Sequence, residues 1–154
     1  YELLDRWSPL EGGNDLRPNL ELPEDDARKP RTLDEMAAEA RRYVEAASEG
    51  LSAPLPSSAL KFGKFDLSPQ QVFFASHSGL SLAIVNLKPL VPGHVMVIPR
   101  RVVDRMGDMT GEELQDLWRT VRQVQALVQD CHGAPCATLG VQDGRDAGQS
   151  VPRV

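Results

Sequence analysis

The sequence has 154 residues, of which 25% are charged and 41% hydrophobic, and its net charge is −5. These values fit one globular domain and argue against a binder of duplex nucleic acid, which would present a basic face. Because no stretch has the ~18 apolar residues that cross a bilayer and no signal peptide opens the sequence, we expect a cytoplasmic or nuclear protein with no membrane partner.

The first thirty residues are rich in Pro, Gly, Asp and Asn, which is typical of an irregular segment. Only residues 1–7 there have the pattern of a short ordered element. Thr32 and Glu35 then form a capping box, which predicts the start of a helix. This helix is expected to end near Gly50. Its apolar face is expected to comprise Met36, Ala40, Tyr43, Val44 and Ala47.

Residues 51–58 contain two prolines and two serines and are predicted to be a linker. Short apolar runs at residues 71–75, 80–86 and 95–98 then predict successive antiparallel strands, with turns between them. Pro92 and Gly93 suit the central positions of a type II turn. The strand after this turn is expected to be buried and to stop at Pro99.

A second capping box, Thr110 with Glu113, begins a helix that the apolar spacing predicts over residues 110–131. Its stripe is expected to contain Leu114, Leu117, Trp118, Val121, Val124 and Val128. Residues 137–141 and 150–154 are predicted to be further strands, with a Gly-rich loop between them. This order predicts an α+β fold with a mainly antiparallel sheet of about five strands, one long helix and a second, shorter helix.

The sequence has three histidines, and a single histidine is more often structural than catalytic. We interpret His77, in a Ser-Gly turn, and His132, near a helix end, as structural residues. His94 opens a strand and is expected to need a polar partner, because an unpaired buried polar group costs about 1–3 kcal/mol. Cys131 and Cys136 have no second pair of ligand residues, so we expect two reduced thiols and no metal site.

The loop from Gln142 to Ser150 allows two interpretations. Gly144 and Gly148 can adopt positive φ and let backbone N–H groups converge on an anion, with Gln149 and Ser150 as further donors. On spacing alone, an ordinary hairpin loop is favoured.

Four segments together resemble the fragile-histidine-triad (Fhit) branch of the HIT superfamily. Residues 86–99, Asn-Leu-Lys-Pro-Leu-Val-Pro-Gly-His followed by an apolar strand, are similar to that branch's Asn-Arg-Lys-Pro-Val-Val-Pro-Gly-His segment. Residues 142–144 and 147–151 resemble the run that leads into its His-x-His-x-His triad. Residues 61–65 resemble its first strand and residues 35–40 its last helix.

The resemblance implies one domain whose segments follow each other in a circularly permuted order. Residues 1–50 resemble the family's C-terminal loop and helix, residues 51–58 are the linker, and residues 59–154 are the HIT core. The nucleophilic triad of the family does not occur in the 154 residues.

The same resemblance implies a diadenosine triphosphate hydrolase that forms a nucleotidyl-histidine intermediate. Asn86 is implied to hold the ribose, and His94 to support the triad. The implied adenine pocket consists of Phe62, Leu67 and Ile84, with Phe65 near the substrate. The implied phosphate contacts are Gln142 and the backbone of Gly148, Gln149, Ser150 and Val151.

Two other classes of function stay open: a catalytically inactive nucleotide-binding sensor or adaptor, and a purely structural interaction domain. The expected ligand is a dinucleoside polyphosphate or a mononucleotide. No tightly bound cofactor is expected, although Mg²⁺ would accompany the substrate phosphates. The resemblance also implies a homodimer, with Trp118 as an interface anchor.

Overall fold

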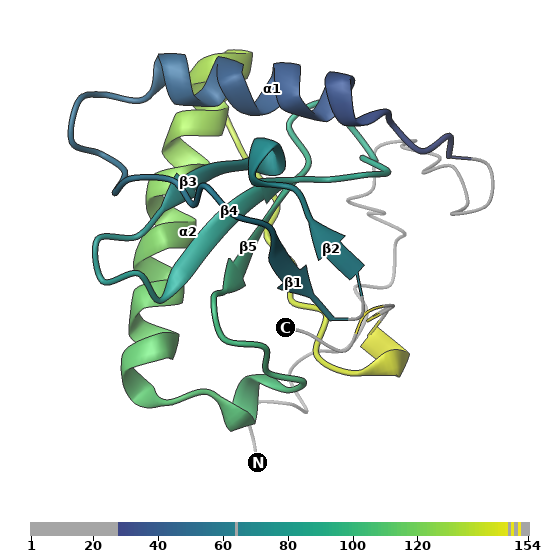
Figure 1. Ribbon diagram of the computed structural model, residues 1–154, viewed down its shortest axis with the longest axis vertical. Coiled ribbons are helices and arrows are strands. Elements are labelled where there is room, and N and C mark those ends of the chain that lie inside the picture. The colour runs from purple at the N-terminus through teal and green to yellow at the C-terminus, as the bar shows by residue number, and fades with distance from the viewer. Residues whose placement is uncertain (1–27, 64, 148, 150, 152–154) are drawn as a thin grey trace, which may run out of the picture.

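The computed structural model describes residues 28–63, 65–147, 149 and 151 (Figure 1). The predicted ordered element at residues 1–7 lies outside these ranges, as does most of the strand predicted at residues 150–154. No helix in the described ranges is both long enough and apolar enough to cross a membrane.

Two helices form where the capping boxes predict them. Helix α1 spans Leu33–Ala46 and helix α2 spans Gly111–His132, and each has both hydrogen bonds of its capping box. Helix α2 ends at Gly133, whose left-handed φ of 59° suits glycine. Helix α1 ends four residues before Gly50, at Ala46. Val44, expected on its core face, is exposed instead.

Within the described ranges, five short strands form two antiparallel sheets. Strands β1 (Leu60–Phe62) and β2 (Phe65–Leu67) make a hairpin. Strands β3 (Val72–Ala75), β4 (Ser81–Val85) and β5 (Val95–Pro99) make a three-stranded sheet in the order β3-β4-β5. The α+β class is confirmed, but the single sheet of about five strands is wrong, because the hairpin packs against the sheet and does not extend it.

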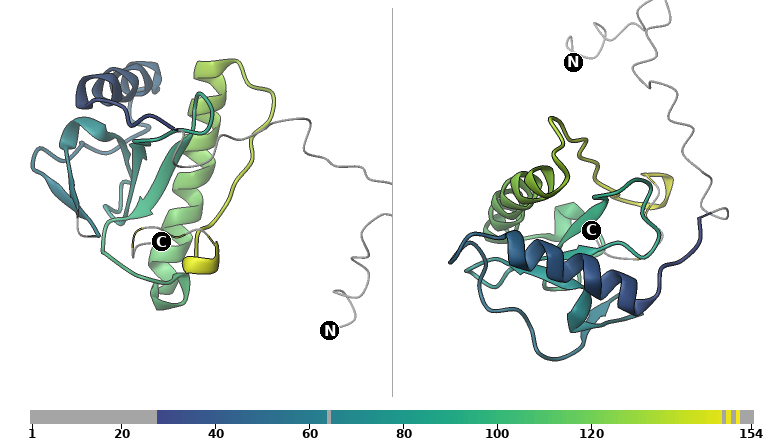
Figure 2. Two further views of the ribbon diagram at one scale, coloured as in Figure 1. Left: turned by 90° about the vertical axis from the view of Figure 1, so that its right-hand side faces the viewer. Right: turned by 90° about the horizontal axis from the view of Figure 1, so that it is seen from above.

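The molecule has three layers, with the β3-β4-β5 sheet in the middle (Figures 1 and 2). Side chains alternate along β4, so Ala83 and Val85 pack with α1 and α2, whereas Leu82 and Ile84 pack with the β1–β2 hairpin. This explains why every residue of β4 is buried. Strand β5 is less buried than predicted, because its first three residues are only half-buried.

Three short 3-10 helices complete the described elements: η2 (Pro69–Gln71), η3 (Met106–Asp108) and η4 (Arg145–Ala147). The strand predicted at residues 137–141 is wrong. This segment is irregular and leaves Leu139 55% exposed. No neighbouring strand within the described ranges pairs with it, and an isolated β pattern has no ladder to join.

Residues 51–58, predicted as a linker, bond along the edge of β3. The Ala53 N–H donates to the carbonyl of Ala75 at 2.9 Å, and the Ser52 hydroxyl oxygen accepts the Ala75 N–H at 3.0 Å. Leu55 packs against the core on the hairpin side. The segment that joins α1 to the hairpin is therefore part of the packed domain.

Candidate functional site

The loop of residues 86–94 joins β4 to β5 and carries the two polar residues singled out in the sequence. Val85 pairs with Val95 at the end of the ladder, so Asn86 and His94 lie opposite each other just beyond it. The predicted type II turn is confirmed. The His94 N–H donates to the carbonyl of Val91 at 3.1 Å, and Gly93 has a φ of 83°.

His94 is half-buried, and both of its ring nitrogens face amide groups. The Leu90 N–H donates to Nδ1 at 3.0 Å, and the side-chain nitrogen of Asn86 lies 3.2 Å from Nε2. Burial lowers the pKa of His94, and the charges of Arg28 and Arg31 lower it further. The ring is therefore held neutral, with its proton on Nε2, because Nδ1 accepts the Leu90 N–H.

The Asn86 side chain has more donors near it than acceptors. Its Oδ1 accepts the Lys88 N–H at 3.0 Å, while its NH₂ group faces the protonated Nε2 of His94. If the oxygen and nitrogen of the Asn86 amide were exchanged, Oδ1 would accept from His94 Nε2, but the NH₂ group would then face the Lys88 N–H. In either orientation one donor has no acceptor among the described residues, and a ligand oxygen beside Asn86 would supply one.

Two arginines of the segment before helix α1 bind the backbone at the start of this loop. The Arg31 N–H donates to the carbonyl of Leu87 at 3.0 Å, and the Arg28 guanidinium donates to the carbonyl of Lys88 at 2.6 Å. The Arg31 guanidinium donates twice to the carbonyl of Asn86, through Nε at 3.0 Å and through a second nitrogen. Three successive carbonyls are thus held by two arginines.

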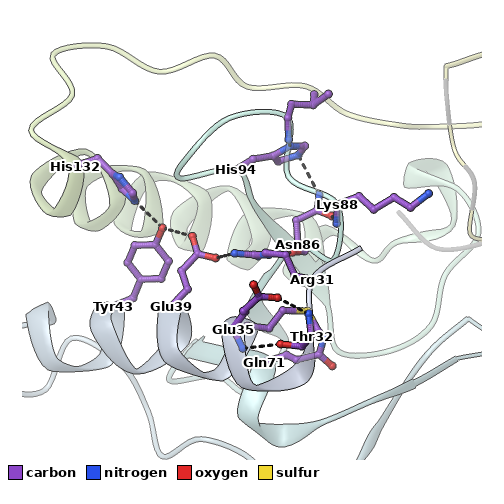
Figure 3. A network of polar contacts seen from close by, with 12 residues as sticks. Arg31, Thr32, Glu35, Glu39, Tyr43, Gln71, Asn86, Lys88, His94 and His132 are labelled. Atoms are coloured by element: carbon purple, nitrogen blue, oxygen red, sulfur yellow. Dashed lines mark hydrogen bonds and ion pairs between the residues drawn. The ribbon is translucent and has the colours of Figure 1, made fainter. Parts of the chain in front are cut away.

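A chain of polar contacts continues from Arg31 along α1 (Figure 3). The third guanidinium nitrogen of Arg31 bonds to Glu39, and the Tyr43 hydroxyl donates to the same carboxylate at 2.9 Å. His132 Nε2, at the end of α2, lies 2.9 Å from the Tyr43 oxygen. Burial and the bond to Glu39 raise the pKa of the Tyr43 hydroxyl well above its usual range. Tyr43 keeps its proton for Glu39, so His132 Nε2 is the donor to Tyr43.

The residues predicted to line the adenine pocket lie at the interface between the hairpin and the sheet. Leu67 and Ile84 belong to one core cluster, and Phe62 packs against it. Leu67 and Ile84 are 5% and 1% exposed, so they belong to the core. Phe62 is half-buried, and Phe65, its cross-strand partner, is 51% exposed.

The loop of residues 142–151 is tied to the segment after β5. Asp143 Oδ1 accepts from Arg105 Nε at 2.9 Å and from the Met106 N–H at 3.2 Å. The side chain of Gln149 accepts the Gly144 N–H at 3.0 Å and donates to the carbonyl of Asp104 at 2.8 Å. Its amide groups are therefore used within the protein. The ordinary hairpin interpretation is wrong within the described ranges, since no strand precedes this loop.

Other predicted phosphate contacts are only partly placed. The side chain of Gln142 is exposed and Val151 is half-buried, whereas Gly148 and Ser150 lie outside the described residues. No hydrogen bond among the described residues joins Gln142 to Asn86. Two hollows lie beside α1, lined by residues such as Leu55 and Arg122. Neither lining contains a residue of the 86–94 loop or of the 142–151 loop. Among the described residues, no three His, Cys, Asp or Glu side chains gather as a metal ion requires.

Sequence reasoning missed Arg31, Glu39 and Arg105. Arg31 stands directly before the capping residue Thr32, a position that indicates nothing by itself. Glu39 and Tyr43 are four residues apart on one helix face, a spacing that could have suggested their contact.

Comparison with known families settles the relationship of this chain. The HIT domain family matches residues 68–154, more than half of the sequence. The chain belongs to the HIT family. The match leaves residues 1–67 uncovered, so the permuted order stays a prediction.

Curated relatives of this HIT protein support the Fhit branch. It is 46% identical over 97 residues to the "Bifunctional bis(5'-adenosyl)-triphosphatase/adenylylsulfatase FHIT" of Arabidopsis thaliana, covering 63% of this chain and 53% of that protein. It is 50% identical over 95 residues to the "Bis(5'-nucleosyl)-tetraphosphatase [asymmetrical]" of Schizosaccharomyces pombe, covering 62% and 50%. The chain thus spans about half the length of these relatives.

Two solved structures share its fold. The nitrilase–Fhit protein NitFhit of C. elegans superposes with a TM-score of 0.60 at 41% identity, over 64% of this chain and 23% of that one. A diadenosine triphosphate hydrolase of Plasmodium falciparum, in complex with Cyclomarin A, superposes with a TM-score of 0.61 over 77% and 76%. At 22% identity, the second supports the fold alone.

Proposed function

We propose that this HIT protein binds the adenosine half of a dinucleoside polyphosphate and forms part of a bis(5'-adenosyl)-triphosphatase. The observation that carries the proposal is the Asn86–His94 pair, in which one donor has no acceptor in the described part of the chain and a ribose oxygen would supply it. The printed activities of the two curated relatives support the choice of substrate class.

In the proposed reaction, an imidazole attacks the α-phosphorus and a nucleoside diphosphate leaves. Water then breaks the phosphorus–nitrogen bond of the nucleotidyl-histidine and releases a nucleoside monophosphate. Phe62 and Phe65 would stack on the base, Asn86 would hold the ribose, and Gln142 with the 148–151 backbone would bind phosphate. Mg²⁺ would accompany the phosphates, without a protein site of its own.

A second candidate, nucleotide binding without turnover, rests on the three histidines of the sequence. His94 Nδ1 accepts the Leu90 N–H and its Nε2 carries the proton, so neither nitrogen has a free lone pair, and His132 donates to Tyr43. His77 contacts the carbonyl of Gly50 at 2.9 Å. No histidine among the 154 residues is therefore placed as a nucleophile. A polypeptide restricted to these residues would bind nucleotide and act as a sensor or adaptor.

One preparation tests both candidates. A polypeptide with a mass of 16.9 kDa is titrated with a non-hydrolysable diadenosine analogue by calorimetry, and release of AMP from diadenosine triphosphate is then followed over hours. We expect binding, and hydrolysis no faster than in buffer, since loss of a nucleophile removes on the order of 10⁶ in rate. Robust turnover would show that a residue of this polypeptide acts as the nucleophile, and His94 would be the first candidate. Absence of binding would refute the proposed function.

The ribose and phosphate contacts are tested by substitution. We expect Asn86→Ala and Gln142→Ala each to weaken binding of the analogue by about 1–2 kcal/mol, because each removes a hydrogen-bonding amide. Gln115→Ala, on the exposed side of α2, serves as the control and should bind as the wild type does. Equal affinities for all four proteins would contradict the assigned contacts.

A further inference from the structure

The amide of Asn86 is positioned by its own backbone. Its Oδ1 accepts the N–H of Lys88, two residues on, so the orientation of the side chain follows the path of residues 86–88. The carbonyls of these residues are held by the segment that leads into α1, across 55 residues of sequence in the case of Arg31 and 60 in the case of Arg28. The orientation of a candidate ribose ligand is thus set by a distant element.

Arg31 makes the central contact. It is the only one of the two arginines recorded at the carbonyl of Asn86 itself, which it approaches with two nitrogens. Its side chain is 20% exposed and that of its partner Glu39 is 16% exposed, so solvent competes little with either bond. A planar guanidinium can hold a carbonyl and a carboxylate at once in a fixed geometry.

The other end of the contact chain is anchored in the core. Glu39 also accepts from Tyr43, which is fully buried and packs against Phe73, with ring centroids 4.7 Å apart and ring planes tilted by 45°. Tyr43 in turn receives the His132 donor, and the His132 ring lies against the turn at Gly93. Both ends of the 86–94 loop therefore contact one network, which Figure 3 shows along α1.

We propose that Arg31 is a positioning residue that holds the Asn86 amide in place for a ribose hydroxyl and thereby sets the preference for ribonucleotides over deoxyribonucleotides. The inference rests on the proposed function, in which Asn86 binds the ribose. Arg31 does not touch the ligand itself, because its recorded donors are directed to Asn86 and Glu39. Displacement of a binding group by about 1 Å is enough to lose a directional hydrogen bond.

The test compares Arg31→Met and Arg31→Lys with the wild type. Lysine keeps the charge but offers one ammonium group, which cannot span Asn86 and Glu39 with the geometry of the fork. Arg42→Met is the matched control. Arg42 lies on α1 and, like Arg31, donates to a backbone carbonyl, but that carbonyl belongs to Cys131 at the end of α2.

The first measurement is the ratio of affinities for AMP and its 2'-deoxy and 3'-deoxy analogues, by calorimetry. These ligands carry the same phosphate, so the ratio is insensitive to loss of the Arg31 charge. We expect the wild type and Arg42→Met to prefer the ribonucleotide by roughly five- to tenfold over at least one analogue. In both Arg31 variants this ratio should fall to about 1–2, as expected when one hydrogen bond is lost.

The second measurement needs no ligand. The side-chain NH₂ signals of Asn86 are followed by NMR and assigned from their loss in Asn86→Ser. We expect one dispersed pair in the wild type and in Arg42→Met, and broadened or random-coil signals in both Arg31 variants.

Arg31 variants that keep the full ribose preference, or an unchanged Asn86 signal, would overturn the inference while leaving the proposed function intact. If the wild type binds none of the nucleotides, the proposed function fails. The NMR comparison then still decides whether Arg31 positions Asn86. A lower melting temperature with an unchanged ratio would assign Arg31 a structural role alone.

Discussion

At the scale of single residues, His94 shows how a buried ring can be kept neutral by its neighbours. Protonation would place a second N–H against the donor from Leu90, and Arg28 and Arg31 add nearby positive charge. The folded protein therefore binds this proton less readily than the unfolded chain does, in which histidine has a pKa of about 6.5.

The first prediction follows from this difference. As pH falls through about 6.5, the unfolded chain takes up a proton that the folded state resists, so the free energy of unfolding decreases until His94 protonates in the folded state. We expect His94→Gln to lose less stability than the wild type between pH 7.5 and 5 in urea titrations. His77→Gln, which alters an exposed histidine, should keep the wild-type slope. Parallel slopes for wild type and His94→Gln would contradict the prediction.

At the scale of elements, the capping box of α2 also anchors the segment after β5. Glu113 accepts the Thr110 N–H at 2.8 Å and two donors of Arg101, each at 2.7 Å. The Arg101 guanidinium and the Thr110 N–H lower the pKa of Glu113 to about 2. One carboxylate thus begins the long helix and fixes the approach to it.

This contact makes the stability of α2 dependent on pH. A carboxylate with a depressed pKa stabilises the fold above its unfolded pKa of about 4.5, and the effect is lost as pH falls toward about 2. We expect Glu113→Gln to be less stable than the wild type at pH 7, with a difference that narrows from pH 4.5 to pH 3. Urea unfolding at several pH values measures this. Glu112→Gln, in the same helical turn but exposed, is the control and should show a smaller and flatter difference.

The elements differ in how far the sequence predicts them. Both helices are predictable, because a capping box and a 3.6-residue period are local signals. Residues 137–141 carry an apolar run that predicts a strand, but a strand also needs a partner, which local sequence does not reveal. The β1–β2 hairpin was missed as a separate sheet, since its strands of three residues are too short to show a period.

The candidate site divides in the same way. The contact between Asn86 and His94 follows from a hairpin register that ends at Val85 and Val95, which the strand predictions nearly define. The hydrogen bonds from Arg31 to the Asn86 carbonyl join residues 55 positions apart. They depend on the packing of α1 on the core, which local sequence does not reveal. The family resemblance implied the roles of these residues, whereas composition and spacing indicated only that they are candidates.

At the scale of the whole molecule, the long helix α2 leaves a large aromatic side chain open to solvent. Trp118 lies on α2, on the side away from the buried residues Leu117 and Val124, and is 44% exposed. An exposed tryptophan on a long helix indicates an interaction surface. The homodimer implied by the family resemblance therefore stays a prediction, with Trp118 as its anchor.

The dimer prediction is tested by sedimentation. We expect the wild type to be dimeric at micromolar concentration and Trp118→Glu to shift toward monomer, because a buried charge in an apolar contact is unfavourable. Val44→Glu is the matched control. It places the same charge on a 43% exposed apolar residue of α1, and it should leave the dimer intact. A wild type that stays monomeric throughout this range would refute the prediction.

The tether between Arg42 and Cys131 joins residues 89 positions apart. A ribosome that adds about 5–20 residues per second completes α1 roughly 5–20 seconds before the end of α2 exists. During that time Met36, Ala40 and Tyr43, which form the apolar face of α1, have no α2 to cover them. Until α2 exists, the apolar face of α1 can pack only on η2, β3 and β4, so the contact between the two helices forms after these.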